Sequence, residues 1–190
     1  MRPTLHSNLL STLLLASLAL ASTGCAPTTT ERLGLAEPET VSGFELEPYL
    51  GTWYEIGNFP QSFQAGCTGT TATYSLREDG NVDVLNRCFE DSLDGPEKTA
   101  NGQARPVELE RGKLEVSFFQ PFWGAYWVLE LGEDYQYSVV GHPSRDYLWI
   151  LSREPQMDEA TLDGILERLE TVHGYELERF ERTTQPDVAG

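Results

Sequence analysis

Three residues that could together form a hydrolytic site, His142, Ser144 and Asp146, lie within five positions of one another. Nucleophilic catalysis of this kind needs a serine, a histidine that takes its proton and an acid that orients the histidine. The three residues lie in the segment His-Pro-Ser-Arg-Asp, however, and Pro, Ser and Asp are typical of turns. We therefore interpret the segment as a turn and not as a catalytic site.

No other motif in the sequence indicates catalysis or metal binding. The sequence lacks the patterns His-Glu-x-x-His, Cys-x-x-Cys and Gly-x-Ser-x-Gly, and it has no phosphate-binding loop. Beyond the N-terminal leader the only histidines are His142 and His173, and neither belongs to a candidate cluster of metal-ligating residues. We expect neither a metal nor another cofactor.

The first 24 residues are typical of a secretory signal. Arg2 precedes an apolar run of about 13 residues, and the small residues Ser-Thr-Gly stand directly before Cys25. The apolar run is shorter than the roughly 20 residues that a membrane-spanning helix needs. We therefore expect residues 1–24 to be removed rather than to remain as a transmembrane anchor.

The residues before Cys25 resemble the bacterial lipobox, in which the cysteine is lipidated and becomes the mature N-terminus. Ser22 stands where that motif usually has Leu. The resemblance implies a lipid anchor on Cys25, and Ala26 after it implies sorting to the outer membrane. The alternative is ordinary cleavage near Ala21, which would leave Cys25 as a free thiol.

Composition and charge restrict the class of protein. Lys and Arg number 13 against 30 Asp and Glu, so the formal net charge is −17, while 39% of the residues are hydrophobic. The composition is that of a globular protein, and the charge excludes nucleic acid as a partner because phosphates bind clustered Lys and Arg. Residues 25–43 are rich in Thr, Pro, Glu and Gly, which predicts a flexible tether. We expect one domain over residues 44–183 and a short tail over 184–190.

Eight segments with the spacing of hairpins are expected to form strands. They cover residues 51–56, 70–76, 82–88, 99–107, 113–119, 125–131, 135–141 and 147–153. The absence of crossover helices between them favours an antiparallel up-and-down barrel, whose interior has room for one small ligand. Apolar residues then recur at helical spacing from Asp158 to just before Gly174, which predicts one amphipathic helix, and residues 177–182 are expected to form a last short strand.

The alternation of residue types in the segment 125–131 predicts which side chains face the interior. Glu130 marks the outer face, which places Trp127 inward and leaves Tyr126 and Val128 on the outer face. An outer face with Tyr and Val is too apolar to be exposed to water. We therefore expect the amphipathic helix to cover it.

The sequence resembles the lipocalin family in three places. Gly-Thr-Trp-Tyr at 51–54 is similar to the first lipocalin motif, Arg-Asp-Tyr at 145–147 stands where the second motif has Thr-Asp-Tyr, and Arg153 matches the arginine of the third. The resemblance covers about residues 44–183 and is strongest to bacterial outer-membrane lipocalins of the apolipoprotein D branch. It implies an all-β, eight-stranded antiparallel barrel with one C-terminal helix packed on its flank.

Within this resemblance, three residues are expected to close one end of the barrel. Gly51 allows a tight backbone turn, and Trp53 supplies a large apolar surface. In the family the matching arginine packs across this tryptophan, so Arg153 is implied to do the same. We assign all three a structural role rather than a role in ligand contact.

Cys67 and Cys88 are the only cysteine pair if Cys25 is lipidated, and an exported protein permits a disulfide. A regular hairpin around Asp79-Gly80 would place Cys67 opposite a residue near 91. A bridge to Cys88 would then need a bulge or a slip of three or four residues, which Gly66 and Gly69 allow. Two free thiols are the alternative.

Aromatic residues are the candidates for the lining of a ligand cavity. They are Phe63, Tyr74, Phe118, Phe122, Trp123, Trp127 and Tyr137. Each could equally be part of the core, but the run Ser-Phe-Phe-Gln-Pro-Phe-Trp places aromatic residues in a hairpin loop, where exposure is unfavourable without an apolar partner. In the family such loops surround the open mouth of the barrel. The resemblance implies a hydrophobic ligand, a fatty acid or a lysophospholipid.

Two classes of function follow. The first is a binding protein for lipid storage or transport, held by its N-terminal anchor on the outer membrane and facing the periplasm, with a homodimer left open. The second is an enzyme acting on a lipid or isoprenoid in the same cavity, for which Cys67 or Cys88 would be the thiol candidates. Free thiols in the mature protein would distinguish the two.

Overall fold

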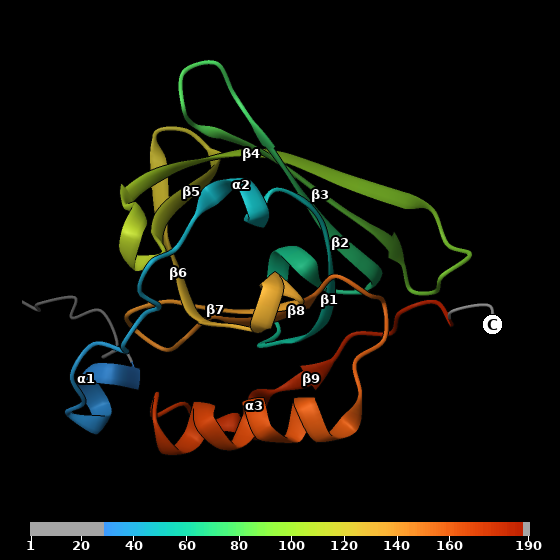
Figure 1. Ribbon diagram of the computed structural model, residues 1–190. Helices are drawn as coiled ribbons and strands as arrows, with labels where there is room; N and C mark the ends of the chain where they lie inside the picture. The colour runs from blue at the N-terminus through green and yellow to red at the C-terminus, as the bar shows by residue number, and fades with distance from the viewer. Residues whose placement is uncertain (1–28, 188–190) are drawn as a thin grey trace, which may run out of the picture.

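The computed structural model describes residues 29–187, which form a closed antiparallel barrel with a helix on its flank (Figure 1). The barrel strands are β1 (Gly51–Asn58), β2 (Cys67–Leu76), β3 (Val82–Glu90), β4 (Glu97–Glu108), β5 (Lys113–Phe119), β6 (Phe122–Leu131), β7 (Tyr137–Gly141) and β8 (Leu148–Ser152). Neighbours in sequence pair with one another, and β1 pairs with both β8 and β2, which closes the barrel. The predicted fold class is confirmed.

Short helices connect or precede the strands, and α3 (Glu159–Thr171) is the long one. The others are α1 (Thr29–Leu33), α2 (Leu46–Tyr49), η1 (Ser62–Gln64), η2 (Leu109–Arg111), η3 (Glu133–Tyr135) and η4 (Leu177–Arg179). The expected last strand over 177–182 is η4 followed by the two-residue strand β9 (Glu181–Arg182), which pairs with β1.

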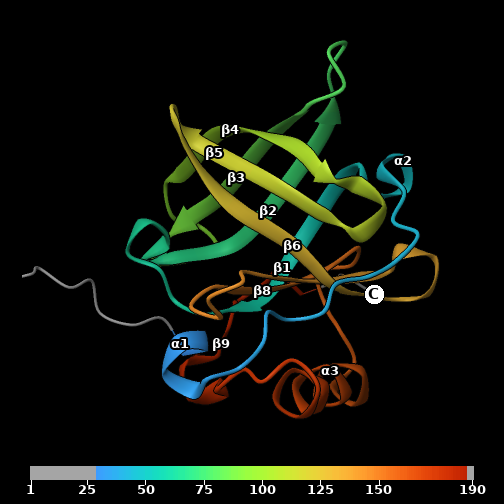
Figure 2. The same cartoon turned by 90° about the vertical axis from the view of Figure 1, so that its left-hand side faces the viewer.

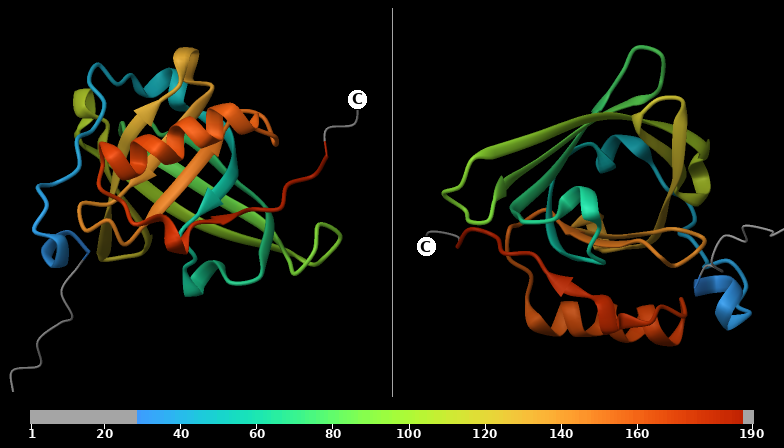
Figure 3. Two further views of the ribbon diagram at one scale, coloured as in Figure 1. Left: turned by 90° about the horizontal axis from the view of Figure 1, so that it is seen from below. Right: turned by 180° about the vertical axis from the view of Figure 1, so that it is seen from behind.

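The meander puts alternate connections at opposite ends of the barrel. The β1–β2, β3–β4, β5–β6 and β7–β8 connections share one end, while α2, η2 and η3 lie at the other. In the left panel of Figure 3, η1 (teal, bottom) and α1 (blue, lower left) mark the first end and α2 (teal, top) marks the second. We call the first end the mouth and the second the closed end.

Trp53 fills the closed end and is fully buried. Its indole Nε1 donates a hydrogen bond to the carbonyl oxygen of Tyr49 in α2 at 2.8 Å. The Arg153 guanidinium carbon lies 3.7 Å from the centre of the Trp53 ring, and Nη1 donates to the Thr52 carbonyl oxygen at 2.9 Å. Gly51 begins β1 with a φ of +91°, a conformation that other residues rarely adopt. The three residues expected at barrel closure therefore lie together at this end.

The helix α3 covers the wall that β7 and β8 form (Figures 1 and 2). It begins after Asp158, whose carboxylate accepts a hydrogen bond from the Thr161 backbone N–H at 2.9 Å. Its buried residues Leu162, Ile165 and Leu169 pack against outward-facing residues of β6, β7 and β8. These strands are consequently apolar on both faces.

The orientation predicted for residues 126–129 of β6 is wrong, whereas Glu130 faces outward as predicted. Tyr126 and Val128 face the barrel interior, whereas Trp127 and Leu129 pack in the cluster beneath α3. The cause is a β-bulge, because the pairing of β6 with β7 shifts register between Val128 and Glu130. A bulge adds one residue to a strand, so the alternation counted back from Glu130 is reversed on its other side.

Glu130 instead links the barrel wall to the end of α3. Its carboxylate accepts hydrogen bonds from Arg168 at 2.7 Å and lies 3.2 Å from Nε2 of His173, which is buried. Partial burial by itself raises the pKa of Glu130, but the hydrogen bonds and charges of His173 and Arg168 outweigh it and lower the pKa. The ionised carboxylate therefore stabilises the packing of α3.

Two segments outside the predicted domain pack on the barrel. Thr29 is buried, and the Val41 N–H donates to the Val128 carbonyl oxygen at 3.1 Å, so the flexible tether expected up to residue 43 is wrong from Thr29 onward. Gln185, expected in a free tail, is buried and donates to the carbonyl oxygens of Glu55 and Thr70, each at 2.8 Å. The sequence did not reveal this docking, because both segments are polar and attach to the barrel through hydrogen bonds rather than through an apolar pattern.

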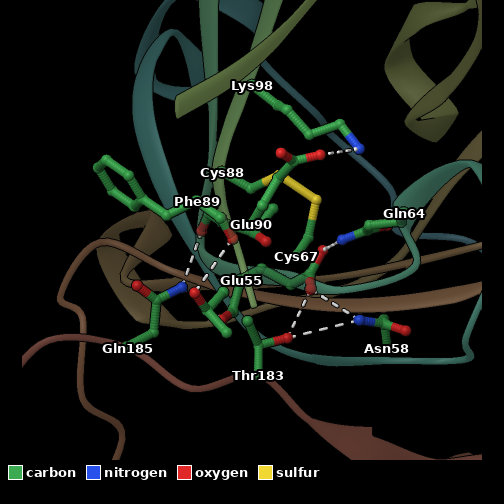
Figure 4. The surroundings of a disulfide bond; sticks show 12 residues. Glu55, Asn58, Gln64, Cys67, Cys88, Phe89, Glu90, Lys98, Thr183 and Gln185 are labelled. Atoms are coloured by element: carbon green, nitrogen blue, oxygen red, sulfur yellow. Dashed lines mark hydrogen bonds and ion pairs between the residues drawn. A yellow bond between two sulfur atoms is a disulfide. The ribbon is translucent and has the colours of Figure 1, made fainter. Parts of the chain in front are cut away.

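Cys67 and Cys88 form a disulfide with a Cα–Cα distance of 5.4 Å (Figure 4). Cys67 lies opposite Glu90, and a one-residue bulge follows between Thr68 and Thr71, with Gly69 at a φ of +59°. Cys67 and Cys88 are therefore diagonal neighbours on the paired strands β2 and β3, and the bulge accompanies an approach close enough for a disulfide. The slip of three or four residues that the sequence suggested is not needed.

Reduction of the disulfide should destabilise the protein. The bridge spans a sequence separation of 21, for which the chain-entropy model gives about 3 kcal/mol. Thermal unfolding with and without dithiothreitol measures the effect, and the double variant Cys67→Ala, Cys88→Ala is the control that should not respond to the reductant. Two alkylatable thiols in the unreduced, denatured chain at positions 67 and 88 would contradict the bridge.

Replacement of Glu130 should destabilise the protein in a pH-dependent way. A carboxylate with a lowered folded-state pKa contributes stability that is fully present above its unfolded pKa, about 4.3, and is lost as the pH falls through the folded pKa. Glu130→Gln should therefore lose about 1.5–3 kcal/mol at pH 7, and its difference from wild type should shrink below about pH 4. Urea unfolding at both pH values tests this, and a difference independent of pH would refute it.

Candidate functional site

A cavity of about 400 Å³ occupies the half of the barrel next to the mouth. It lies within the size range of small-molecule sites, about 300–1,000 Å³. Apolar side chains from six strands form its deeper wall, and they are Tyr74, Val84, Val116, Tyr126, Val140 and Leu151. Because Trp53 fills the closed end, a ligand would enter and leave the cavity through the mouth.

Three tyrosine hydroxyls close the floor of the cavity. The Tyr126 hydroxyl lies 2.7 Å from that of Tyr49 and 2.9 Å from that of Tyr74, and the Tyr49 hydroxyl lies 3.0 Å from Oγ of Ser138. Burial raises the pKa of Tyr49 to about 12, despite its hydrogen bonds, so the hydroxyls stay neutral. Because these groups satisfy one another, the floor presents mainly ring carbons to a ligand.

Glu55 is a buried carboxyl in the cavity wall that sequence reasoning missed. Its oxygens accept hydrogen bonds from Asn58 Nδ2 at 2.7 Å, Gln64 Nε2 at 2.5 Å and Thr183 Oγ1 at 2.5 Å (Figure 4). Burial raises its pKa, and the three hydrogen bonds oppose this shift. The signal was present in the sequence, because Glu55 stands two positions after Trp53 and so shares its inward face.

Gln64 connects the short helix η1 to this network. While its Nε2 donates to Glu55, its Oε1 accepts a hydrogen bond from Trp149 Nε1 at 3.3 Å. Trp149 also lines the cavity. The segment between β1 and β2 is thereby held at the mouth by a side chain that reaches into the interior.

The rim of the cavity is polar and includes the cationic residues Arg87 and Lys98. Lys98 pairs with Cys88 across β3 and β4, and its ammonium lies 3.1 Å from the Glu90 carboxylate (Figure 4). The disulfide between Cys67 and Cys88 is part of the same lining. A ligand that enters the cavity must pass these groups.

The residues of the suspected triad have the geometry of a turn. His142 Nδ1 accepts a hydrogen bond from the Ser144 backbone N–H at 3.1 Å and lies 2.8 Å from Oγ of the same serine. The Asp146 carboxylate accepts from Thr29 Oγ1 at 2.8 Å and not from the histidine. A triad would need serine and acid on different ring nitrogens of the histidine. The arrangement is that of side chains supporting a loop.

Of the seven aromatic residues expected to line the cavity, Phe63, Tyr74 and Phe118 do so. Phe122 lies outside it and stacks on Phe119 with ring centres 6.3 Å apart. The others lie on the outer surface of the barrel. Trp123 lies under the Arg105 guanidinium, while Trp127 and Tyr137 pack against the cluster beneath α3, so the inward orientation predicted for the last two is wrong.

Tyr126, Tyr147 and Trp149 are the aromatic lining residues that the sequence analysis did not assign. Tyr126 was missed because of the bulge in β6, which cannot be recognised from the residue types in that strand. Trp149 and Tyr147 share the alternation of Leu151, but β8 is apolar on both faces, so parity alone could not choose the interior face.

Neither a metal site nor a spanning helix is found in the described part of the chain. Among residues 29–187 no group of three or more His, Cys, Asp or Glu side chains could hold a metal ion. No helix in that range combines the length and the apolar character needed to cross a membrane.

Comparisons with known proteins identify the family. The model of the lipocalin-like domain matches residues 44–185. The outer membrane lipoprotein Blc of Escherichia coli K12 is 40% identical over 147 residues, which cover 77% of this chain and 82% of that protein. Temperature-induced lipocalin-1 of Arabidopsis thaliana is 39% identical over 160 residues, which cover 80% and 85%, and apolipoprotein D of Mus musculus is 36% identical over 158 residues, which cover 78% and 80%.

A solved structure agrees with these relatives. Insecticyanin of the tobacco hornworm Manduca sexta superposes with a TM-score of 0.62 at 21% identity, and the match covers 80% of this chain and 86% of that one. This likeness concerns the fold alone. Together with the family model and the sequence relatives, the barrel and its closure show that the chain belongs to the lipocalin family.

Proposed function

We propose that this protein binds a single-chain lipid, a fatty acid or a lysophospholipid, in the barrel cavity and stores or carries it at the bacterial outer membrane. The observation that carries the proposal is the cavity of about 400 Å³ with an apolar, aromatic floor and a polar rim. An acyl chain of roughly fourteen methylenes gains at most about 11 kcal/mol on burial before ordering costs are subtracted. Micromolar or tighter affinity follows.

The distribution of charge in the cavity favours one orientation of the lipid. Among residues 29–187 the floor carries no cation, and the hydroxyls of Tyr74 and Tyr126 already hydrogen-bond to each other, so a ligand carboxylate or phosphate placed there would be buried without a partner. Lys98 is near the mouth. We therefore place the acyl chain on the tyrosine floor and the anionic head group at the rim.

Binding is favoured over catalysis. The enzyme alternative needed a free thiol at Cys67 or Cys88, and the disulfide between them removes that nucleophile. His142, Ser144 and Asp146 form a turn rather than a triad.

The location is proposed from the leader and from the relatives. Residues 1–28 lie outside the described part of the structure, so lipidation of Cys25 remains a prediction from the sequence. Support comes from the bacterial relatives, which are named outer membrane lipoproteins. We propose an anchor on Cys25 with the domain facing the periplasm.

Removal of the anchor cysteine should release the protein. One acyl chain gives only marginal membrane binding, whereas the several chains of a lipoprotein hold it essentially permanently. Cys25→Ser should move the protein from the membrane fraction to the soluble fraction after cell breakage, and Cys25→Ala should behave alike. A variant that remains in the membrane fraction would contradict lipidation at this residue.

Two tryptophan variants should separate ligand contact from core packing. Trp149 lines the cavity, so Trp149→Ala should weaken fatty-acid binding by about 1–3 kcal/mol. Trp127 packs outside the barrel, so the matched variant Trp127→Ala should lower stability but keep the affinity. The affinity should also change little with moderate salt, because burial supplies most of it.

Fluorescence titration of delipidated protein with a fatty acid at two salt concentrations measures how the variants and the salt change the affinity. Circular dichroism is the control for folding. Equal loss of affinity in the two variants, or no saturable binding by the wild type, would refute the assignment of the cavity.

A further inference from the structure

The segment that follows the proposed anchor is fastened to the β7–β8 loop. Thr29 Oγ1 donates a hydrogen bond to the Asp146 carboxylate at 2.8 Å. Thr30 Oγ1 donates to the Pro143 carbonyl oxygen at 2.6 Å, and its backbone N–H donates to the Ser144 carbonyl oxygen at 3.2 Å. These contacts fix the beginning of α1 against one particular loop of the barrel.

Arg145 strengthens this attachment from within the loop. Its side chain is only 4% exposed, and it donates hydrogen bonds to Thr30 Oγ1 at 2.7 Å, to the Ala36 carbonyl oxygen at 2.9 Å and to the His173 carbonyl oxygen at 2.5 Å. The residue has a φ of +58°, which is unusual for a residue other than glycine. One buried guanidinium thus joins the N-terminal segment, the loop and the chain just after α3.

The loop that holds the segment belongs to the mouth. His142 and Tyr147, at its two ends, line the cavity, and α1 lies at the mouth end of the barrel in Figure 3. Cys25 precedes Thr29 by four residues, which span at most about 14 Å when fully extended. An anchor on Cys25 must therefore hold this side of the mouth close to the membrane surface.

The mouth also carries exposed aromatic rings. Phe119 and Phe122 at the β5–β6 tip are 75% and 71% exposed and stack on each other, and Phe63 in η1 is 69% exposed. Water-exposed rings of this size are unfavourable unless they meet an apolar partner. The β5–β6 tip and η1 are the two connections next to the β7–β8 loop around the barrel.

The β3–β4 loop lies on the opposite side of the mouth from α1 (Figure 1). It carries the exposed acids Asp91 and Asp94. Lipid phosphates repel such a loop, so the barrel is expected to tilt with this side away from the membrane.

We propose that the docked N-terminal segment orients the barrel with its mouth against the lipid bilayer, the β5–β6 tip and η1 touching the lipids and the β3–β4 loop raised. The partner is the surface of the membrane that holds the anchor, and lipid would then pass between bilayer and cavity without crossing water. This inference rests on the proposed lipidation of Cys25.

Quenching of tryptophan fluorescence by brominated lipids tests the orientation. The lipidated protein is reconstituted in vesicles of phosphatidylethanolamine and the anionic lipid phosphatidylglycerol, with a tryptophan added by Phe122→Trp at the tip, Ser92→Trp in the raised loop or Leu76→Trp at the closed end. We expect the added emission of Phe122→Trp to be quenched at least twofold more than that of Leu76→Trp, with Ser92→Trp well below Phe122→Trp. Equal quenching of Phe122→Trp and Leu76→Trp would overturn the orientation, and equal quenching of Phe122→Trp and Ser92→Trp would overturn the tilt.

Two further measurements test the docked N-terminal segment and ligand binding separately. A ten-residue Gly-Ser insertion between Thr28 and Thr29 lengthens the reach of the anchor and should reduce the contrast between the tip and closed-end reporters. An unchanged contrast would overturn the role of the docked segment. Fatty-acid titration of Cys25→Ser protein, free of vesicles, reports ligand binding separately, so saturable binding together with equal quenching would refute the orientation and leave the binding function standing.

Discussion

The stacking of Arg153 on Trp53 seals one end of the barrel, and the ligand cavity depends on this seal. A barrel of eight strands has two ends, and a ligand cavity needs one of them sealed. The guanidinium lies 3.7 Å from the ring centre and also donates to the Thr52 and Pro48 carbonyl oxygens, so it joins β8, β1 and the residues of α2. A cation over an indole ring contributes about 0.5–2 kcal/mol, and the hydrogen bonds to the backbone add to it.

The seal determines how the remaining polar groups are distributed. Below the cavity, the hydroxyls of Tyr49, Tyr74 and Tyr126 hydrogen-bond to one another, so the floor is uncharged and its polar atoms are already paired. Above it, Glu55 receives hydrogen bonds from Asn58, from Gln64 and from Thr183 in the C-terminal segment. The change from an apolar floor to a polar rim along one axis matches the change from tail to head group in a single-chain lipid.

The two chain segments outside the strands complete the open half. After β9 the C-terminal segment runs along the wall, where Gly69 donates to the Thr184 carbonyl oxygen and Gln185 bridges Glu55 and Thr70, so it joins β1 and β2 beyond the residues that pair directly. The N-terminal segment binds the β7–β8 loop through Thr29, Thr30 and Arg145. Both attachments act at the end of the barrel where the ligand must pass.

The sequence by itself determined the number and order of the strands, the flanking helix and the closure residues. Period-two alternation and turn residues are local signals that follow from backbone geometry over a few residues, whereas the closure residues were implied by the resemblance of the motif around Trp53 to the lipocalin family. The pairing of Cys67 with Cys88 could be proposed because they are the only cysteine pair once Cys25 is lipidated, with two free thiols as the alternative. The local pattern could not determine which face of each apolar strand points into the barrel.

Only the tertiary structure decided those faces, because β6, β7 and β8 are covered by α3 on one side and by the core on the other. The bulge before Glu130 reversed the orientation of Trp127 and Tyr126, and a bulge depends on the register with the neighbouring strand rather than on residue type. The docking of Thr29 and Gln185 was hidden for a related reason. Hydrogen bonds between residues more than 100 positions apart form only when the fold has brought their partners together, so polar segments that look like tethers in the sequence become part of the barrel.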